Sequence, residues 1–409
     1  MDLFKVISVD EVKKMLDEVF ETTVECEEIN IKNAGARIIS KDIVSSINVP
    51  SFRRSTVDGY AVTSRDTAGA SESIPAMMTL KGEVTMGKAP LYSLALPGEC
   101  VYVPTGGMLP EGSDSVVMIE YTDKLDEDTI LINSPVAYGD NVVQIGEDIT
   151  NDERVLQKGA KLRPYEIGLL SSLGIGNVQV YKKPKIAIIS TGDEIVGCDE
   201  KPEIGQVRDI NSYILSSAVI EDGGEPINYG VIKDSYEELK KTVDDAIEKC
   251  DIVLISGGSS VGKKDQTLKV INALEESELL AHGISIKPGK PTIIAKIGDK
   301  AVFGLPGHPL SCSVVYKVIV NHYINKITNY NHKNYPVLCK FEINYHKAKG
   351  REEYLPVTLE RNEDGEIIAN PVFSKSGLIT GFTKAWGYLK INKNDEGIKE
   401  GQTVYAYKF

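Results

Sequence analysis

The stretch 249–265, KCDIVLISGGSSVGKKD, has the residue types of an anion-binding loop. Its apolar run at 252–255 predicts a buried parallel strand, and the spacing of Leu268, Ile271 and Leu274 predicts a helix after the loop. Glycines and hydroxyl side chains lie between them. A strand, a glycine-rich loop and a helix direct backbone N–H groups and a helix N-terminus at one place, which stabilises an anion. The sequence therefore predicts a site for a phosphorylated or oxyanionic ligand.

The same loop fits the nucleotide-binding pattern G-x-x-x-x-G-K from Gly257 to Lys263. Lys264 stands where a P-loop carries the Ser or Thr that binds Mg²⁺, and Asp265 adds a negative charge directly after it. We therefore interpret the match to a P-loop as incidental. On this stretch alone, an ordinary glycine-rich turn between a strand and a helix remains an alternative.

The loop belongs to a region, 183–330, in which strands and helices alternate. Strands are expected at 185–191, 226–232, 251–256, 285–296 and 301–305, and helices at 209–222, 235–249, 265–280 and 309–327. This order predicts a central α/β domain with a mostly parallel sheet and right-handed crossovers. Ligands of such sheets bind beyond the carboxyl ends of the strands.

The loops at those carboxyl ends are rich in Gly, Asp and Lys. They are Ser190-Thr191-Gly192-Asp193-Glu194, Asp234, the stretch 257–265, Lys287-Pro288-Gly289-Lys290-Pro291 and Leu305-Pro306-Gly307-His308-Pro309. Five such loops on one rim are hard to explain as turns alone. Their convergence favours a binding site at this edge of the sheet.

The rest of the chain predicts smaller, β-rich parts. Ser8 and Glu11 form a capping box for a helix, and Asp58-Gly59 and Thr105 before a double glycine indicate turns. Short strands are expected at 79–84, 99–104, 115–121 and 129–132, and again at 337–343, 354–359, 367–369, 387–391 and 403–407. We divide the chain into an N-terminal linker and helical-β subdomain (1–48 and 136–182), an all-β insertion module (49–135), the α/β domain (183–330) and a small C-terminal β domain (335–409).

Composition excludes several classes of partner. The net charge of −13 over 409 residues argues against nucleic acid, whose phosphates need a basic face. No apolar run approaches the ~20 residues that span a bilayer, and the N-terminus lacks the apolar core of a signal peptide, so we expect a cytoplasmic protein without a membrane partner. Six cysteines and five histidines are scattered without a C-x-x-C pair, which indicates neither disulfides nor zinc.

Seven motifs in order resemble the molybdopterin molybdotransferase family, the MoeA-like proteins that include the E domain of gephyrin. They are SFRRSTVDGYAV, PTGGMLPEGSDSVVMIE, GEDI, STGDEI, SGGSSVGKKDQT, IKPGKP and LPGHPLS. The resemblance covers 2–409. It implies a homodimer of four-subdomain chains that inserts molybdate into adenylylated molybdopterin and releases AMP, with an α/β domain of the molybdopterin-binding type.

Matching positions imply roles for individual residues. The resemblance places Asp58, Thr105, Asp148, Glu194, Asp234 and Asp265 around the substrate and its Mg²⁺, with Glu194, Asp234 and Asp265 as metal ligands. It places Lys287, Lys290, Ser311, Arg351 and Ser376 around molybdate. Substrate binding is further assigned to the rim residues Ser190, Thr191, Gly192, Gly257, Gly258, Ser259 and Gly262. The chemistry agrees, since a tetrahedral dianion is bound by ammonium, guanidinium and hydroxyl donors and Mg²⁺ by carboxylates.

Two other functions stay open as alternatives: a molybdopterin adenylyltransferase and a non-catalytic scaffold like gephyrin. The N-terminal carboxylate motifs and the C-terminal β domain favour insertion over adenylylation. His308, where many relatives have Asn, and Gly283, where a basic residue is frequent, depart from the family pattern. These departures bear on which oxyanion the site prefers. The sequence leaves the choice between molybdate and tungstate open, because both are dianions of similar size.

Overall fold

The computed structural model describes residues 6–21, 23–257, 266–331, 334–373 and 377–409. The chain divides into two compact units. Unit 1 comprises Met1–Ser40, Lys158–Arg163 and Val178–Phe409, and unit 2 comprises Lys41–Gln157 and Pro164–Asn177. This division is coarser than the four expected subdomains, whose bounds stay a prediction.

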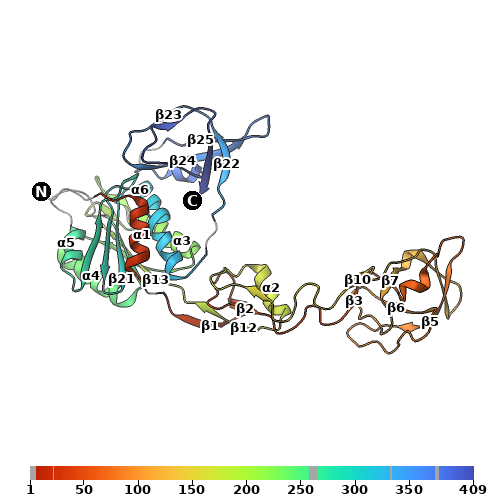
Figure 1. The fold of residues 1–409 in the computed structure, drawn as a ribbon. Helices are drawn as coiled ribbons and strands as arrows, with labels where there is room; N and C mark the ends of the chain where they lie inside the picture. The colour runs from red at the N-terminus through yellow and green to blue at the C-terminus, as the bar shows by residue number, and fades with distance from the viewer. Residues whose placement is uncertain (1–5, 22, 258–265, 332–333, 374–376) are drawn as a thin grey trace. The chain divides into compact units, whose positions relative to one another are not determined.

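Unit 1 contains a six-stranded sheet in the order β16, β13, β17, β21, β20, β18, of which β13 and β21 are labelled in Figure 1. β16, β13, β17 and β21 run parallel, and β20 and β18 continue the sheet antiparallel, so the sheet is mixed. The strands are β13 (Lys185–Thr191), β16 (Glu225–Ile232), β17 (Ile252–Ser256), β18 (Ser277–His282), β20 (Ile293–Ile297) and β21 (Lys300–Leu305). The helices around them are α1 (Val9–Val19), α3 (Asn211–Glu221), α4 (Tyr236–Lys249), α5 (Gln266–Asn272), α6 (Pro309–Val315) and α7 (Asn321–Ile327), with a π-helical segment Tyr316–Val320 between the last two.

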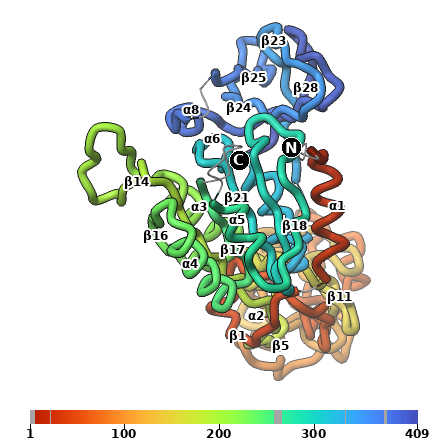
Figure 2. Tube along the Cα trace, turned by 90° about the vertical axis from the view of Figure 1, so that its left-hand side faces the viewer, coloured from red at the N-terminus to blue at the C-terminus, as the bar shows by residue number. Residues whose placement is uncertain are grey.

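Successive residues of the central strands belong to two different cores. Ile252 and Leu254 of β17 lie in one core with α1, α3, α6 and α7, whereas Val253 and Ile255 lie in another with α4 and α5. The two-residue period of a strand dictates this alternation, and helices therefore cover both faces (Figure 2). Burial of each such side chain contributes about 1.5–3 kcal/mol. The apolar runs seen in the sequence are thus explained by two covered faces.

The capping box expected at α1 is confirmed. The Ser8 hydroxyl accepts a hydrogen bond from the Glu11 N–H at 3.3 Å, and the Glu11 carboxylate accepts one from the Ser8 N–H at 2.7 Å. Both bonds satisfy N–H groups that a helix start leaves open. α1 lies within 1–48, yet its buried face, Val12 and Leu16 included, packs into the core of the central sheet.

The helix expected at 265–280 is wrong in its second half, because α5 ends at Asn272 and β18 begins at Ser277. The Glu, Leu and Ala residues of this stretch favour a helix locally. They form an edge strand instead, in which Leu279 lies opposite Ala295 of β20. Pairing with the sheet overrides the local preference.

The single strand expected at 285–296 is also wrong, because it is two strands, β19 (Ile286–Lys287) and β20. Pro288 and Pro291 lie between them and lack the N–H that a sheet ladder requires. β19 leaves the central sheet and pairs in parallel with β24 (Glu352–Arg361). This pairing joins the α/β part to the C-terminal part of unit 1.

The C-terminal part is a small closed sheet. Its strands stand in the order β24, β25, β22, β28, β26, and a further pairing of β24 with β26 closes the ring. The expected strands are confirmed as β22 (Val337–Phe341), β24, β25 (Ile367–Pro371), β26 (Gly387–Ile391) and β28 (Thr403–Lys408). The minor elements of this part are β23 (Tyr345–His346), β27 (Gly397–Ile398) and α8 (Thr380–Lys384).

Unit 2 is built on a six-stranded sheet in the order β7, β4, β6, β5, β9, β8. The strands are β4 (Gly59–Val62), β5 (Ala76–Glu83), β6 (Glu99–Val103), β7 (Ser115–Met118), β8 (Thr122–Lys124) and β9 (Thr129–Ile132). The Asp58-Gly59 turn does not close a hairpin, because β3 (Arg54–Ser55) pairs with β10 (Val142–Val143) and β4 pairs with β6 and β7.

Short elements complete the two units. They are β2 (Ile43–Val44), which pairs with β11 (Arg154–Leu156), α2 (Pro164–Ser172), β1 (Cys26–Asn30), which pairs with β12 (Asn177–Tyr181), and β14 (Ile195–Val196), which pairs with β15 (Val207–Arg208). Within the described ranges, no helix combines the length and the apolar character needed to cross a bilayer.

Candidate functional site

Two carboxylates lie at the ends of β13 and β16, on the rim where the sequence predicts a ligand. Thr191, the last residue of β13, donates its hydroxyl proton to Asp234 Oδ1 at 2.6 Å. The Asp234 N–H donates to Asp193 Oδ1 at 3.2 Å. Both aspartates are exposed, and neither forms an ion pair with a described residue. The loops after two parallel strands thus hold each other and present negative charge to solvent.

Glycines allow the rim loops to come close together. At Gly257, where φ is 107°, a Cβ atom would lie 2.1 Å from the carbonyl oxygen of Thr191. At Gly192 a Cβ atom would lie 2.9 Å from the Glu194 carboxylate. The Gly257 N–H also donates to the Leu305 carbonyl at 3.2 Å. The ends of the three central parallel strands are therefore in backbone contact, which only glycine permits.

Asn211 links these loops, and sequence reasoning missed it. As a residue it is 5% exposed, and its side-chain amide donates to Ser256 Oγ at 2.6 Å and to the Gly307 carbonyl at 2.7 Å. Asn211 Oδ1 and Ser190 Oγ are buried without a hydrogen-bond partner in the described part of the chain. A polar residue at the first position of a helix that packs on the rim was the available signal. Unsatisfied buried polar atoms are costly, so this region is built for more than packing.

A thiol is present behind the rim but is not a nucleophile. Burial raises the pKa of Cys312 to about 12, despite a hydrogen bond with Ser256 that lowers it. A thiol with this pKa stays protonated near neutral pH, and the thiolate is the reactive form. Burial therefore disfavours the reactive thiolate form of Cys312.

Part of the set predicted around molybdate lies where β19 meets β24. Lys287 Nζ lies 2.7 Å from Glu353 Oε1, and the strand register places these two residues opposite each other. Arg351 directly precedes β24 and is exposed. At Gly289 a Cβ atom would lie 3.5 Å from the carbonyl oxygen of Ser311, a buried residue of α6. The structure thus brings Lys287 next to Gly289, Ser311 and the strand of Arg351, and adds a carboxylate that the sequence did not predict.

The remaining members of that set are placed as follows. Lys290 is exposed, forms no ion pair with a described residue, and accepts a backbone hydrogen bond from Ile284 at 3.0 Å. His308 occupies the N-cap position of α6 without a side-chain capping hydrogen bond and is exposed. Gly258, Ser259, Gly262, Asp265 and Ser376 lie outside the described residues.

Unit 2 carries the other three predicted residues. Asp58 Oδ1 accepts a hydrogen bond from the Thr105 N–H at 2.8 Å, so these two residues lie together. The Asp148 N–H donates to the Val49 carbonyl at 3.1 Å, and its side chain is exposed. The catalytic roles of these residues stay predictions.

The donor set of the rim fits Mg²⁺ in chemistry. Among the described residues, no three His, Cys, Asp or Glu side chains are grouped to hold a metal by themselves. Mg²⁺ is usually bound by one or two carboxylates together with substrate phosphates and water. Asp234, which accepts a hydrogen bond from Thr191, and Glu194, whose carboxylate lies beside Gly192, supply such carboxylates. The third predicted ligand is Asp265.

Three family models match consecutive parts of the chain. They describe the MoeA N-terminal region (domain I and II) at residues 7–174, a probable molybdopterin binding domain at 187–326, and the MoeA C-terminal region (domain IV) at 339–409. Together they span both units and include the rim, the β19–β24 pairing and the Asp58 turn.

Known proteins match over nearly the whole length. A putative molybdopterin biosynthesis protein of Methanocaldococcus jannaschii is 32% identical and is aligned over 96% of this chain and 94% of its own. A molybdopterin molybdenumtransferase of Haemophilus influenzae is 31% identical over 98% of both chains. The crystal structure of a molybdopterin biosynthesis MoeA protein from Pyrococcus horikoshii matches with a TM-score of 0.85 at 31% identity, over 99% of this chain and 100% of that one.

Proposed function

Since this chain belongs to the MoeA family, we propose that it is a molybdopterin molybdenumtransferase of molybdenum cofactor biosynthesis that inserts molybdate into adenylylated molybdopterin and releases AMP. The observation that carries the proposal is the full-length match to transferases of this name, together with the rim that Thr191, Asp234 and Asn211 build. The names of the relatives support a molybdopterin molybdenumtransferase. The adenylylated form of the substrate, molybdate as the metal source and the release of AMP are proposed in addition.

The proposed reaction needs two kinds of site, and the described residues supply groups for both. At the rim, Asp234 is oriented by the Thr191 hydroxyl and Glu194 stands beside Gly192, so oxygen ligands are available for Mg²⁺. When bound there, Mg²⁺ would neutralise the phosphates of the adenylate. Near the β19–β24 pairing, we expect Lys287, Lys290 and Arg351 to supply the ammonium and guanidinium donors that bind a tetrahedral dianion.

Positioning of the bound substrate by the rim loops should account for much of the rate of adenylate cleavage. The glycines at 192 and 257 allow a ligand to approach the backbone, and Asn211 fixes the loops on which the ligand would rest. Cleavage of the adenylate then depends on charge stabilisation at the rim, as in other phosphoryl transfers. No thiol is required, which agrees with the raised pKa of Cys312.

The experiment is a single-turnover assay with purified chain, adenylylated molybdopterin, Mg²⁺ and molybdate. We expect AMP release and metal transfer that both require molybdate, and tungstate assayed in parallel identifies the preferred oxyanion. Formation of adenylylated molybdopterin from molybdopterin and ATP, without metal transfer, would instead establish the adenylyltransferase.

The proposal includes a homodimer in the cytoplasm, as the family resemblance and the sequence imply. Light scattering at micromolar concentration tests the assembly. A fully active monomer would contradict it.

A further inference from the structure

Glu353 is a buried carboxylate whose two oxygens have different surroundings. Glu353 Oε1 lies 2.7 Å from Lys287 Nζ and accepts a hydrogen bond from the Tyr345 hydroxyl at 2.6 Å. Glu353 Oε2 is buried and has no hydrogen-bond partner in the described part of the chain. Glu353 is 4% exposed as a residue, whereas the Lys287 side chain is 48% exposed. The ion pair thus joins a buried anion to a cation that reaches solvent.

Strand register, rather than chance side-chain contact, places this pair. β19 and β24 are parallel, with Ile286 opposite Glu352 and Lys287 opposite Glu353. On the preceding residues, the Ser285 hydroxyl donates to the Gly350 carbonyl at 2.6 Å and the Glu352 N–H donates to the Ser285 carbonyl at 3.0 Å. Backbone and hydroxyl contacts therefore hold the two strands in the register that the ion pair needs.

The energetics of burial keep Lys287 at Glu353. A buried carboxylate that loses its cation is strongly unfavourable, and Tyr345 would then be its one remaining described donor. An ammonium group has three N–H donors, of which the bond to Glu353 uses one. Lys287 can therefore stay with Glu353 and still donate two hydrogen bonds to a ligand from its exposed side.

We propose that Glu353 is a positioning residue for the oxyanion site: it holds the ammonium group of Lys287 in place and lowers the positive charge that the site presents. Glu353 offsets the charge of Lys287, one of the three cations that the proposed function assigns to the dianion. The inference rests on the proposed function for the identity of that anion. It deepens that function by assigning a role to a residue beyond the predicted donors.

Binding of sodium molybdate to the purified full chain tests the charge. Glu353→Gln keeps the shape of the side chain and removes its charge, so we expect molybdate to bind about three- to tenfold more tightly in equilibrium dialysis at low salt. The gain should shrink as salt is added, because screening weakens charge effects at the exposed side. Glu360→Gln, an exposed carboxylate on the same strand, is the matched control and should change nothing. Equal or weaker binding by Glu353→Gln would overturn the charge role, and amine labelling decides the positioning role separately.

Amine labelling tests the positioning without any anion. Reductive methylation of the apo chain should modify Lys287 more slowly than Lys290, and Glu353→Gln should abolish the difference. An unchanged rate at Lys287 would overturn the positioning role. Glu353→Asp, which keeps the charge, should not tighten molybdate binding and serves as the second variant if Glu353→Gln fails to fold. Absence of molybdate binding by the wild-type chain would contradict the proposed function, whereas labelling would still decide the role of Glu353.

Discussion

Asp234 at the sheet rim and Glu353 at the β19–β24 pairing are both held by a hydroxyl donor 2.6 Å away, yet their charges have different partners. Asp234 is exposed and has no ion pair with a described residue. Glu353 is buried and balanced by Lys287. The same chemical group thus faces solvent in one region, where we propose that it binds Mg²⁺, and balances a cation in the other, because burial and the nearest cation differ.

The largest effect should come from the rim. Asp234→Asn removes a charge on which the proposed Mg²⁺ site depends, and we expect single-turnover AMP release to fall about 10²–10³-fold, equivalent to about 3–4 kcal/mol of transition-state stabilisation. Asp265→Asn should act similarly. Asp244→Asn, at an exposed i,i+4 pair with Lys240 on α4, is the control. Near-normal turnover in Asp234→Asn would contradict the proposed metal-binding role of Asp234 and would remove the difference in role between Asp234 and Glu353.

A second test concerns stability at the β19–β24 pairing. Lys287→Met leaves the Glu353 charge buried without its cation, and we expect a loss of about 1–3 kcal/mol in urea unfolding, less than for a fully buried pair because Lys287 is half exposed. The double variant Lys287→Met/Glu353→Gln should recover most of the loss. A double variant as unstable as the single one would show that the pair is not what stabilises this region.

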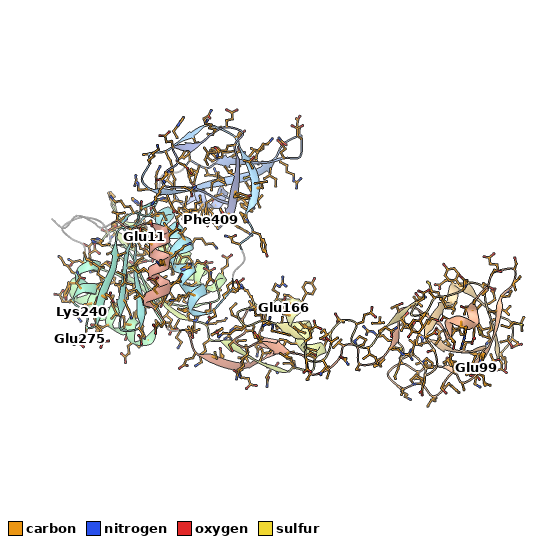
Figure 3. All side chains as sticks on the ribbon, viewed as in Figure 1. Glu11, Glu99, Glu166, Lys240, Glu275 and Phe409 are labelled. Carbon is orange, nitrogen blue, oxygen red and sulfur yellow. The ribbon has the colours of Figure 1, made fainter. Side chains whose placement is uncertain are left out.

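Glu99 of unit 2, labelled in Figure 3, offers a carboxylate with both oxygens satisfied. The N–H groups of Leu96 and Ala95, followed by Lys81, lower the pKa of Glu99. A lowered pKa means that this stabilisation is present above the pKa of an unfolded carboxyl group and is lost as the pH falls through the folded value. We expect Glu99→Gln to lower the Tm at pH 7 and to flatten its decline between about pH 5 and pH 3. Parallel Tm curves for both proteins would contradict this.

The smallest effect should come from the thiols. Burial raises the pKa of Cys100 and Cys312 to about 12, whereas Cys26 and Cys198 are exposed. Iodoacetamide at pH 8 should modify the exposed pair alone and leave turnover nearly unchanged, as peptide mapping and the AMP assay can show. Modification of Cys312 with loss of activity would mean that a thiol acts at the rim. The activity of the rim would then not depend on the Asp234 carboxylate alone.

Local sequence determined the elements whose pattern reports burial. β13, β17 and β21 follow from apolar runs covered on both faces, and the start of α1 follows from its capping box. The order of polar loops predicted the rim, and the motifs predicted the family. These features depend on residues close together in the chain, so a single sequence is enough to find them.

Tertiary structure alone decided which distant residues meet. The stretch 277–282 has helical composition, but pairing with β20 makes it a strand. Lys287 is a predicted anion ligand, but the register of β19 against β24 gives it Glu353 as a partner. Asn211 joins Ser256 and Gly307 only because three strands end side by side. Strand register and burial are properties of the assembled sheets, and for this reason the local pattern could not contain them.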